Sequence, residues 1–181
     1  MGKQIADSLK KQQFPNHDLE IVAFLAKQIL NCERVILMIY TAMTKKAMKI
    51  SYQAHKDQVD KSGIPYIFHP IHLSEQMETE EAVIVALLHD VVEDTDWSIS
   101  DLEEEGFSKD IIDALVLLTH HAEIEYLDYI RKIKNSSNRY AKIVKIADLK
   151  HNSDISRFDH IDEEISKRIE KYTKAIKILS V

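Results

Sequence analysis

Few residues in this chain interrupt helices, because its 181 residues include only three glycines and three prolines. Segments in which β-branched and polar residues alternate, the pattern typical of half-buried strands, are also scarce. These deficits exclude a protein built mainly from strands and tight turns. We therefore predict an all-α protein with short connections and no β-sheet.

The sequence has a single cysteine, Cys32, which cannot form a disulfide within the chain. Its cysteine content therefore does not call for an oxidising compartment. The segment MGKQIADSLKK at the start lacks the apolar core of a signal peptide, and the apolar run 84–88 is too short to span a bilayer. We expect a soluble protein of the cytoplasm with no membrane partner.

Positive charge is in deficit as well, with 24 lysines and arginines against 30 aspartates and glutamates and a formal net charge of -6. Proteins that bind nucleic-acid polymers usually carry a basic surface that neutralises phosphates. We therefore expect no DNA or RNA polymer as a partner. The length suits one domain that is large enough to bury a core.

Apolar residues recur at helical spacing through most of the chain. Helices are predicted over residues 19–30, 35–58, 71–77, 81–88, 100–106, 110–120, 126–134 and 163–179, the first two being separate helices or one kinked helix. The segment 60–66 contains Gly63 and Pro65 and is predicted to be a loop. The last helix is a packing helix that could also form the surface of a homodimer.

The stretch ALLHDVVEDTD, residues 86–96, places ionisable side chains directly after an apolar run. The run itself is apolar on nearly every face, as expected of a helix buried inside a helical domain. If that helix continues, His89 and Glu93 share one face, and Asp90 and Asp94 form the neighbouring row. Acids at the end of a buried helix need a cation, a proton or hydrogen bonds to offset their desolvation. We favour a metal.

Two further residues could complete a metal site. His69 lies in YIFHP, and Asp148 interrupts the apolar run IVKIADL, where Ile143, Ile146 and Ala147 are predicted to face the core. A lone His-Asp pair is more often a helix cap or a surface ion pair. Two imidazoles and two carboxylates from separate segments can instead surround a divalent ion and leave positions open for water and substrate.

Three motifs carry a resemblance to a known family. K-S-G-x-P-Y-I-x-H-P, A-L-L-H-D-V-V-E-D-T and V-K-I-A-D-x-x-H-N occur in this order, and together they resemble the hydrolase domain of the RelA/SpoT family, a branch of the HD-domain metal-dependent phosphohydrolases. The resemblance spans residues 54–155. It implies one compact all-helical HD-domain fold over residues 51–181, with about eight to ten helices around a buried metal-site helix. Residues 1–50 would form an N-terminal helical extension packed on that domain.

The resemblance also implies roles for particular residues, motif by motif. Its metal ligands would be His69, His89, Asp90 and Asp148, and its acidic pair beside the catalytic water would be Glu93 and Asp94. Positions that line the nucleotide pocket match Lys61, Ser62, Tyr66 and Asn152. Manganese is the usual metal of such domains, although mixed nitrogen and oxygen ligands also suit iron, cobalt or zinc.

By this resemblance the chain would be a small alarmone hydrolase of the stringent response, which releases pyrophosphate from the 3′ position of guanosine tetra- or pentaphosphate (ppGpp or pppGpp). Two alternatives remain open. One is an HD-type phosphohydrolase of another nucleotide or phosphorylated metabolite, and the other is a non-catalytic, metal-stabilised binding or sensor module. Retention of both Glu93 and Asp94 argues against the non-catalytic module, because a purely structural metal needs only its ligands.

Three positions depart from the alarmone-hydrolase pattern. Asp60 stands where such enzymes commonly have an arginine that stacks on guanine, Leu149 replaces the arginine of A-D-R, and Ile155 aligns with a pocket threonine. Asp60 either marks a missing clamp on the base, or turns into solvent, caps the loop before Gly63 or pairs with Lys61. These departures affect recognition of the base and leave the metal ligands unchanged.

Overall fold

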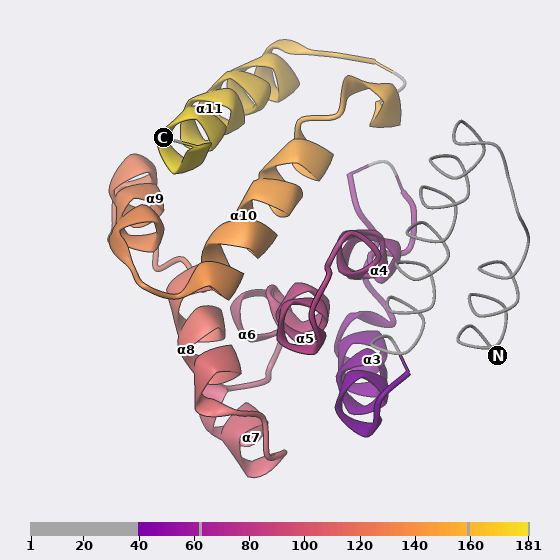
Figure 1. The fold of residues 1–181 in the computed structure, drawn as a ribbon. Coiled ribbons are helices and arrows are strands. Elements are labelled where there is room, and N and C mark those ends of the chain that lie inside the picture. Colours follow the sequence, from indigo (N-terminus) through magenta and orange to yellow (C-terminus); the bar gives the residue numbers. More distant parts are fainter. Residues whose placement is uncertain (1–39, 62, 159, 181) are drawn as a thin grey trace, which may run out of the picture.

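Helices succeed one another through residues 40–61, 63–158 and 160–180, the part of the chain that the computed structural model describes (Figure 1). They are α3 (Ala42–His55), α4 (Phe68–Ser74), α5 (Glu80–Leu88), α6 (Val91–Asp94), α7 (Ile99–Glu104), α8 (Lys109–Leu118), α9 (Tyr126–Asn135), α10 (Arg139–Asn152), the 3₁₀ turn η1 (Ile155–Arg157) and α11 (Glu163–Ser180). Within these residues, β pairing is limited to one isolated bridge between Val59 and Pro65. The prediction of an all-α fold is confirmed.

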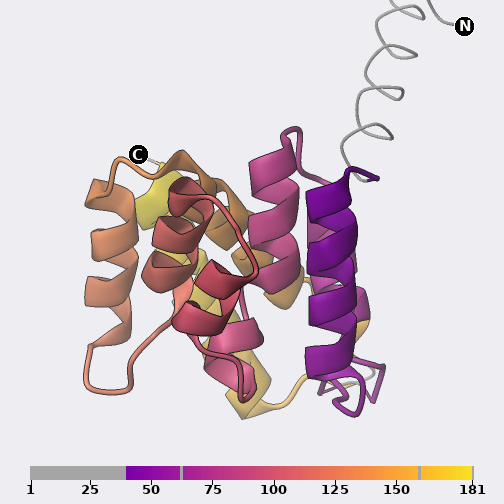
Figure 2. The same cartoon turned by 90° about the horizontal axis from the view of Figure 1, so that it is seen from below.

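Helix α5 occupies the centre of the fold. It packs against α3, α4, α8 and α10, and Figures 1 and 2 show it between α3 and the α8–α10 side of the molecule. Every residue from 82 to 88 is buried, which explains why the run is apolar all round. Thr79 is its N-cap, and the Thr79 side chain accepts a hydrogen bond from the Ala82 N–H. The buried helix predicted from residues 81–88 is therefore present at almost those bounds.

From the sequence, His89 and Glu93 would share one face only if helix α5 continued through the ionisable residues. It does not continue. Helix α5 ends at Leu88, His89 caps it, and Asp90 is the N-cap of the separate four-residue helix α6. The expected common face of His89 and Glu93 is thus interrupted. His89 and Asp90 nevertheless keep backbone angles in the αR region.

Helix α10 presents its buried face through Tyr140, Ala141, Val144, Ala147 and Asp148. Asp148 lies on the core side, as predicted, but the prediction for Ile143 was wrong, because this residue is 47% exposed. Val144 takes the core position instead, since residues 144 and 148 lie one helical turn apart on the same stripe.

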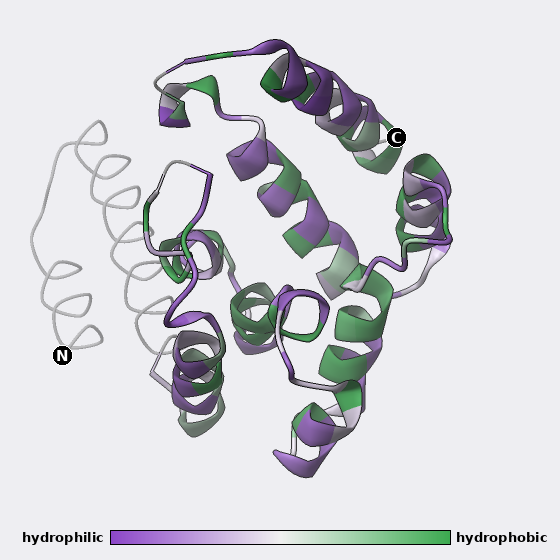
Figure 3. Ribbon diagram, turned by 180° about the vertical axis from the view of Figure 1, so that it is seen from behind, coloured by the Kyte–Doolittle hydropathy of each residue, from purple (hydrophilic) through white to green (hydrophobic). Residues whose placement is uncertain are grey.

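The outer helix α11 covers α10 and α9 and buries only Ala175 and Leu179 completely. Figure 3 shows it mainly hydrophilic, in contrast to the hydrophobic α8. Its bounds match the predicted helix 163–179 within one residue.

The loop between α3 and α4 is tied by its own backbone. Gly63 adopts a φ of +76°, a conformation that side chains disfavour, and the Asp60 N–H donates to the Ile64 carbonyl at 2.8 Å. This turn leads into Tyr66 and then His69 in the first turn of α4.

Part of the sequence prediction lies outside the described residues, namely the helix 19–30, the beginning of the helix 35–58, and Ser62. The division between residues 50 and 51 falls within α3, and the N-terminal extension stays a prediction. Among the described helices, none combines the length and the apolar character needed to cross a membrane.

Candidate metal centre and its pocket

Four side chains from three segments converge beside the end of α5. Donor atoms of His69, His89 and Asp90 all lie within 4.8 Å of one another. The Nε2 atoms of the two histidines are 3.3 Å apart, and His89 Nε2 lies 2.9 Å from Asp90 Oδ2. Asp148 Oδ1 approaches from α10, at 3.4 Å from His69 Nε2 and 4.0 Å from His89 Nε2. The structure thus gathers the four residues that the motifs singled out as metal ligands.

A hydrogen bond of His89 shows which of its two ring nitrogens can act as an electron-pair donor in the cluster. Its Nδ1 lies 2.9 Å from the Ala86 carbonyl oxygen, so Nδ1 donates, because a carbonyl can only accept. In the neutral ring Nε2 therefore carries no proton, and its lone pair points toward a nitrogen of the second imidazole and an oxygen of a carboxylate. Such a set of electron-pair donors requires a cation or an added proton, and its two imidazoles and two carboxylates fit a divalent transition metal.

The charges of the cluster support the same interpretation. Burial lowers the pKa of His89, but the carboxylates of Asp90 and Asp148 outweigh this effect and raise the pKa to about 9. Burial raises the pKa of Asp90, but His89 prevails and lowers it to about 2. The site therefore favours positive charge strongly enough to keep a buried imidazole protonated, and a divalent ion would satisfy the same preference.

Further side chains hold the two carboxylates in place. Lys145 Nζ donates to Asp148 Oδ2 at 2.8 Å, and Asn152 Nδ2 donates to Asp148 Oδ1 at 2.5 Å. Burial raises the pKa of Tyr66, and Asp90 raises it further, so the phenol stays protonated and donates its O–H to Asp90 Oδ2. Tyr66 and Asn152, expected to line the nucleotide pocket, thus also contact the candidate ligands.

Sequence reasoning missed the role of Lys145. Burial lowers the pKa of this lysine, but Asp148 raises it more, and the balance lies well above the usual value. Its ammonium group also lies 5.5 Å from the centre of the Tyr129 ring. The signal was the spacing, because residues three apart on a helix are neighbours. Asp148 therefore has a permanent cation on one oxygen and the histidine pair on the other.

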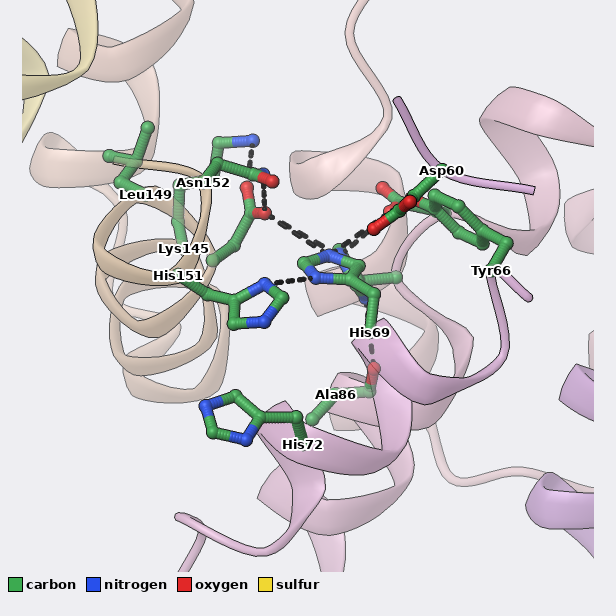
Figure 4. Close-up of polar contacts among 12 residues, drawn as sticks. Asp60, Tyr66, His69, His72, Ala86, Lys145, Leu149, His151 and Asn152 are labelled. Atoms are coloured by element: carbon green, nitrogen blue, oxygen red, sulfur yellow. Dashed lines mark hydrogen bonds and ion pairs between the residues drawn. The ribbon is translucent and has the colours of Figure 1, made fainter. Parts of the chain in front are cut away.

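His151 was missed as well, although it lies three residues after Asp148 on the same helix. Its Nδ1 is 2.8 Å from His69 Nδ1, and its ring centroid lies 4.6 Å from that of His72, with the two ring planes tilted by 35°. Figure 4 shows His151 and Asn152, from α10, facing His69 across the site. His72 thus belongs to the surroundings of the cluster, behind His151.

The expected catalytic acids lie on the short helix α6, and both are solvent-exposed. Glu93 Oε2 accepts a hydrogen bond of 2.9 Å from the His120 backbone N–H. Burial, Asp90 and Glu93 raise the pKa of Asp94 to about 6. A carboxyl group that titrates there can exchange protons near neutral pH, as a general base or acid must. Their catalytic role stays a prediction.

A cavity of about 220 Å³ opens on the cluster through His69 and Tyr66. Its other lining residues are Val59, Asp60, Lys61, Asn152, Arg157, Phe158 and Arg168. Three of the nine side chains are cations, so the cavity can attract anionic groups although the chain is acidic overall. The structure therefore brings Lys61, Tyr66 and Asn152 together as predicted for the nucleotide pocket.

Asp60 neither turns into solvent nor pairs with Lys61. Its Oδ1 accepts from the Ile64 N–H at 3.0 Å, which caps the loop, and its Oδ2 lies 2.7 Å from Arg157 Nη2. Lys61 pairs with Glu164 of α11 at 3.3 Å instead. The loop-capping alternative for Asp60 is confirmed, with Arg157 as an added and unforeseen partner.

Comparisons with known proteins point to one family, although no family model matches the chain. A probable guanosine-3′,5′-bis(diphosphate) 3′-pyrophosphohydrolase of Synechocystis is 31% identical over 88% of this chain, and a GTP pyrophosphokinase of Myxococcus xanthus is 31% identical over 71%. The matched segments make up 23% and 19% of those relatives, so the chain spans about a fifth of their length.

A solved structure shows the same likeness in three dimensions. It is that of a metazoan ortholog of SpoT, which hydrolyses ppGpp and plays a role in starvation responses. The two folds superpose with a TM-score of 0.64 at 26% identity, over 77% of this chain and 86% of the other. The relatives, the shared fold and the histidine–aspartate cluster agree with the three motifs, and the chain belongs to the family of RelA/SpoT-type HD-domain hydrolases.

Proposed function

We propose that this chain is a metal-dependent alarmone hydrolase, which removes pyrophosphate from the 3′ position of guanosine tetra- or pentaphosphate. The observation that carries the proposal is the buried cluster of His69, His89, Asp90 and Asp148 beside a cationic cavity. The names of the Synechocystis relative and of the metazoan SpoT ortholog support this substrate. The reaction would take place in the cytoplasm on a small nucleotide, without a nucleic-acid polymer, and the protein could act as a homodimer.

Manganese is the metal that we propose, with iron, cobalt or zinc as possible substitutes. When bound, it would acidify a water molecule and withdraw charge from the phosphoryl group. His69 and His89 would hold it through Nε2, since Nδ1 of each ring is engaged by His151 or by the Ala86 carbonyl. Asp90 and Asp148 would neutralise its charge, and Tyr66, Lys145 and Asn152 keep these carboxylates oriented.

The acidic pair of α6 would handle the protons of the reaction. Asp94, whose pKa lies at about 6, is suited to accept the proton of the attacking water at neutral pH. Glu93 is anchored to the His120 backbone, which fixes the position of its carboxylate. Lys61, Arg157 and Arg168 would balance the charge of the polyphosphate. Ser62, which the sequence motif assigns to the same pocket, lies outside the described residues.

The test is a product analysis with purified, manganese-loaded protein and a panel of nucleotides that includes guanosine tetraphosphate. We expect guanosine diphosphate and pyrophosphate in equal amounts. Asp148→Asn is the inactive variant, and Asp113→Asn, on the exposed side of α8, is the matched control that should retain activity.

Turnover of a different nucleotide instead would favour a phosphohydrolase with another substrate, an alternative that Asp60, Leu149 and Ile155 suggest. No turnover of any compound by metal-loaded protein would favour the binding or sensor module.

A further inference from the structure

The side chain of Gln58 connects the end of α3 to the end of α6. Its Nε2 donates a hydrogen bond of 2.9 Å to the backbone carbonyl of Asp94, and its Oε1 lies 2.7 Å from His55 Nδ1. The Asp94 carbonyl can only accept, so the amide nitrogen of Gln58 faces it and the amide oxygen faces the imidazole. His55 Nδ1 therefore carries a proton and donates a hydrogen bond to Gln58.

His55 is suited to hold this amide in one orientation. It is the last residue of α3 and is buried, and its ring centroid lies 4.9 Å from that of Tyr66. Burial lowers the pKa of His55, so the ring stays neutral at neutral pH. Within the described part of the chain, His55 Nε2 is buried and has no hydrogen-bond partner. Nδ1 is thus the ring nitrogen through which His55 acts on its surroundings.

Helix α6 has only four residues, so its position depends on contacts with the rest of the fold. A helix of this length is not stable by itself, and the carbonyl groups of its last turn have no partner within the helix. Gln58 provides a partner for one of them, that of Asp94. The neighbouring Glu93 is held by the His120 N–H. The two expected catalytic acids are thus fixed by different elements, Glu93 through its carboxylate and Asp94 through its backbone.

The backbone of Gln58 is also linked to the metal centre. The Tyr66 N–H donates to the Gln58 carbonyl at 2.9 Å, and the Tyr66 hydroxyl donates to Asp90 Oδ2. Asp94 lies close enough to the centre for Asp90 to raise the pKa of its carboxyl group. A shift of Gln58 would therefore change the distance between the Asp94 carboxylate and the candidate metal ligands.

We infer that Gln58, oriented by His55, is a positioning residue that holds the Asp94 carboxylate at the metal centre. The inference rests on the proposed function, in which Asp94 accepts the proton of the attacking water. Gln58 binds the backbone of Asp94 and so leaves the carboxylate available for that proton. Neither Gln58 nor His55 is among the residues that line the 220 Å³ cavity, so both act on the reaction through Asp94 and not on the substrate.

The test compares turnover of guanosine tetraphosphate by the manganese-loaded full chain and its variants. Gln58→Glu keeps an acceptor for His55 but replaces the N–H donor to Asp94 by a carboxylate oxygen. We expect kcat to fall by roughly ten- to a hundredfold, as when a reacting group is misplaced by about 1 Å, at an unchanged Michaelis constant and metal content. Gln53→Glu adds the same charge at an exposed position of α3 and is the matched control, which should retain wild-type turnover.

A double-variant cycle separates positioning from a general loss of structure. If Gln58 acts through Asp94, adding Gln58→Glu to Asp94→Asn should lower the remaining kcat by less than about twofold, because residues that act as a unit are not additive. A loss in this background as large as in the wild type would overturn the inference. Gln58→Met, uncharged and of similar length, should lose kcat as well. Wild-type turnover of this variant would assign the effect of glutamate to its charge and would also overturn the inference.

The role of His55 is tested by two substitutions at that position. His55→Asn places an amide N–H as many bonds from Cβ as Nδ1 and should retain most of the kcat. His55→Phe keeps a ring without a donor and should lose kcat as Gln58→Glu does. Equal kcat in the two variants would contradict the orienting role of His55. This pair also decides the inference should the Gln58 variants not fold.

Failure of the proposed function gives a different pattern, because the wild type would then leave guanosine tetraphosphate intact. Backbone amide hydrogen exchange tests the contact in that case too. Gln58→Glu should speed exchange in the segment 91–95 by roughly two- to tenfold over Gln53→Glu, the factor for the loss of one hydrogen bond, and unchanged exchange would show that Gln58 does not hold α6. If instead the wild type hydrolyses guanosine tetraphosphate and Gln58→Glu keeps its kcat, the function stands and the positioning role is wrong.

Discussion

The Nδ1 atoms of His69 and His151 lie 2.8 Å apart, so one of the two rings donates a hydrogen bond to the other. Burial lowers the pKa of His151, and His69 and Arg157 lower it further, to about 4, which keeps this ring neutral at physiological pH. The contact orients His69 so that its Nε2 atom faces the cluster.

Replacing His151 by alanine should therefore weaken metal binding although the residue is no ligand. Loss of a partner that orients a ligand typically costs ten- to a hundredfold in affinity, and we expect an effect of roughly that size. Competition with a fluorescent chelator measures it. His121→Ala, on an exposed turn, is the control, and equal affinity of both variants would exclude the orienting role.

His89→Ala should abolish the metal site rather than weaken it. The substitution removes the side chain whose Nε2 lies within 3.3 Å of both His69 Nε2 and Asp90 Oδ2. Elemental analysis should find one divalent ion per wild-type chain and almost none in the variant. Full occupancy in His89→Ala would contradict the assignment.

Glu93→Gln should keep the metal and lose most of the turnover. The amide oxygen can still accept the His120 N–H, so the local structure is retained while the carboxylate is lost. A positioned general base contributes on the order of a hundred- to ten-thousand-fold, and we expect a loss in this range for Glu93→Gln or for Asp94→Asn. Near-normal turnover in both variants would make the pair structural.

Asp94 should also make the stability of the folded protein depend on pH. Its pKa of about 6 in the folded chain exceeds the ordinary value of 3.8, so the folded state binds more protons than the unfolded state between these values. Stability should therefore fall as the pH rises from about 4 to about 6. In metal-free protein, Asp94→Asn should raise the melting temperature at pH 7 and leave it unchanged at pH 3.5, which thermal unfolding can check.

Asp60→Arg should raise the Michaelis constant for guanosine tetraphosphate. The substitution removes the loop cap at Ile64 and places a second cation against Arg157. Asp57→Arg makes the same change of charge at an exposed residue three positions earlier in the sequence and serves as the control. A fall in the Michaelis constant of Asp60→Arg would mean that the site lacks a clamp which an arginine at this position restores.

The all-helical fold could be predicted from local patterns, whereas the convergence of His69, His89, Asp90 and Asp148 was implied by the resemblance of the three motifs to the family. Apolar spacing defined the helices, and a carboxylate among core residues of α10 had to meet a cation or a donor. The break after Leu88 could not be predicted in this way, since a turn with helical backbone angles at His89 leaves no glycine or proline in the sequence.

The Asp60–Arg157 ion pair could not be predicted from the sequence for a different reason. Its members are 97 residues apart, and neither belongs to an element whose periodicity gives a direction to its side chain. Lys61, next to Asp60 in sequence, was the obvious partner, but the tertiary fold directs this lysine to Glu164. Only the packing of the segment after α10 against the loop before α4 decides the pairing.

The junction of α5 and α6 brings two donors from consecutive residues to the metal centre. The backbone at His89 and Asp90 keeps αR angles, and the rotamers of the two side chains bring His89 Nε2 to 2.9 Å from Asp90 Oδ2. One peptide unit can therefore chelate an ion with two donors of different kinds, an imidazole and a carboxylate. Because residues 82–88 are locked in the core, this chelate is rigid before the ion arrives, and metal affinity should report directly on how well α5 is packed.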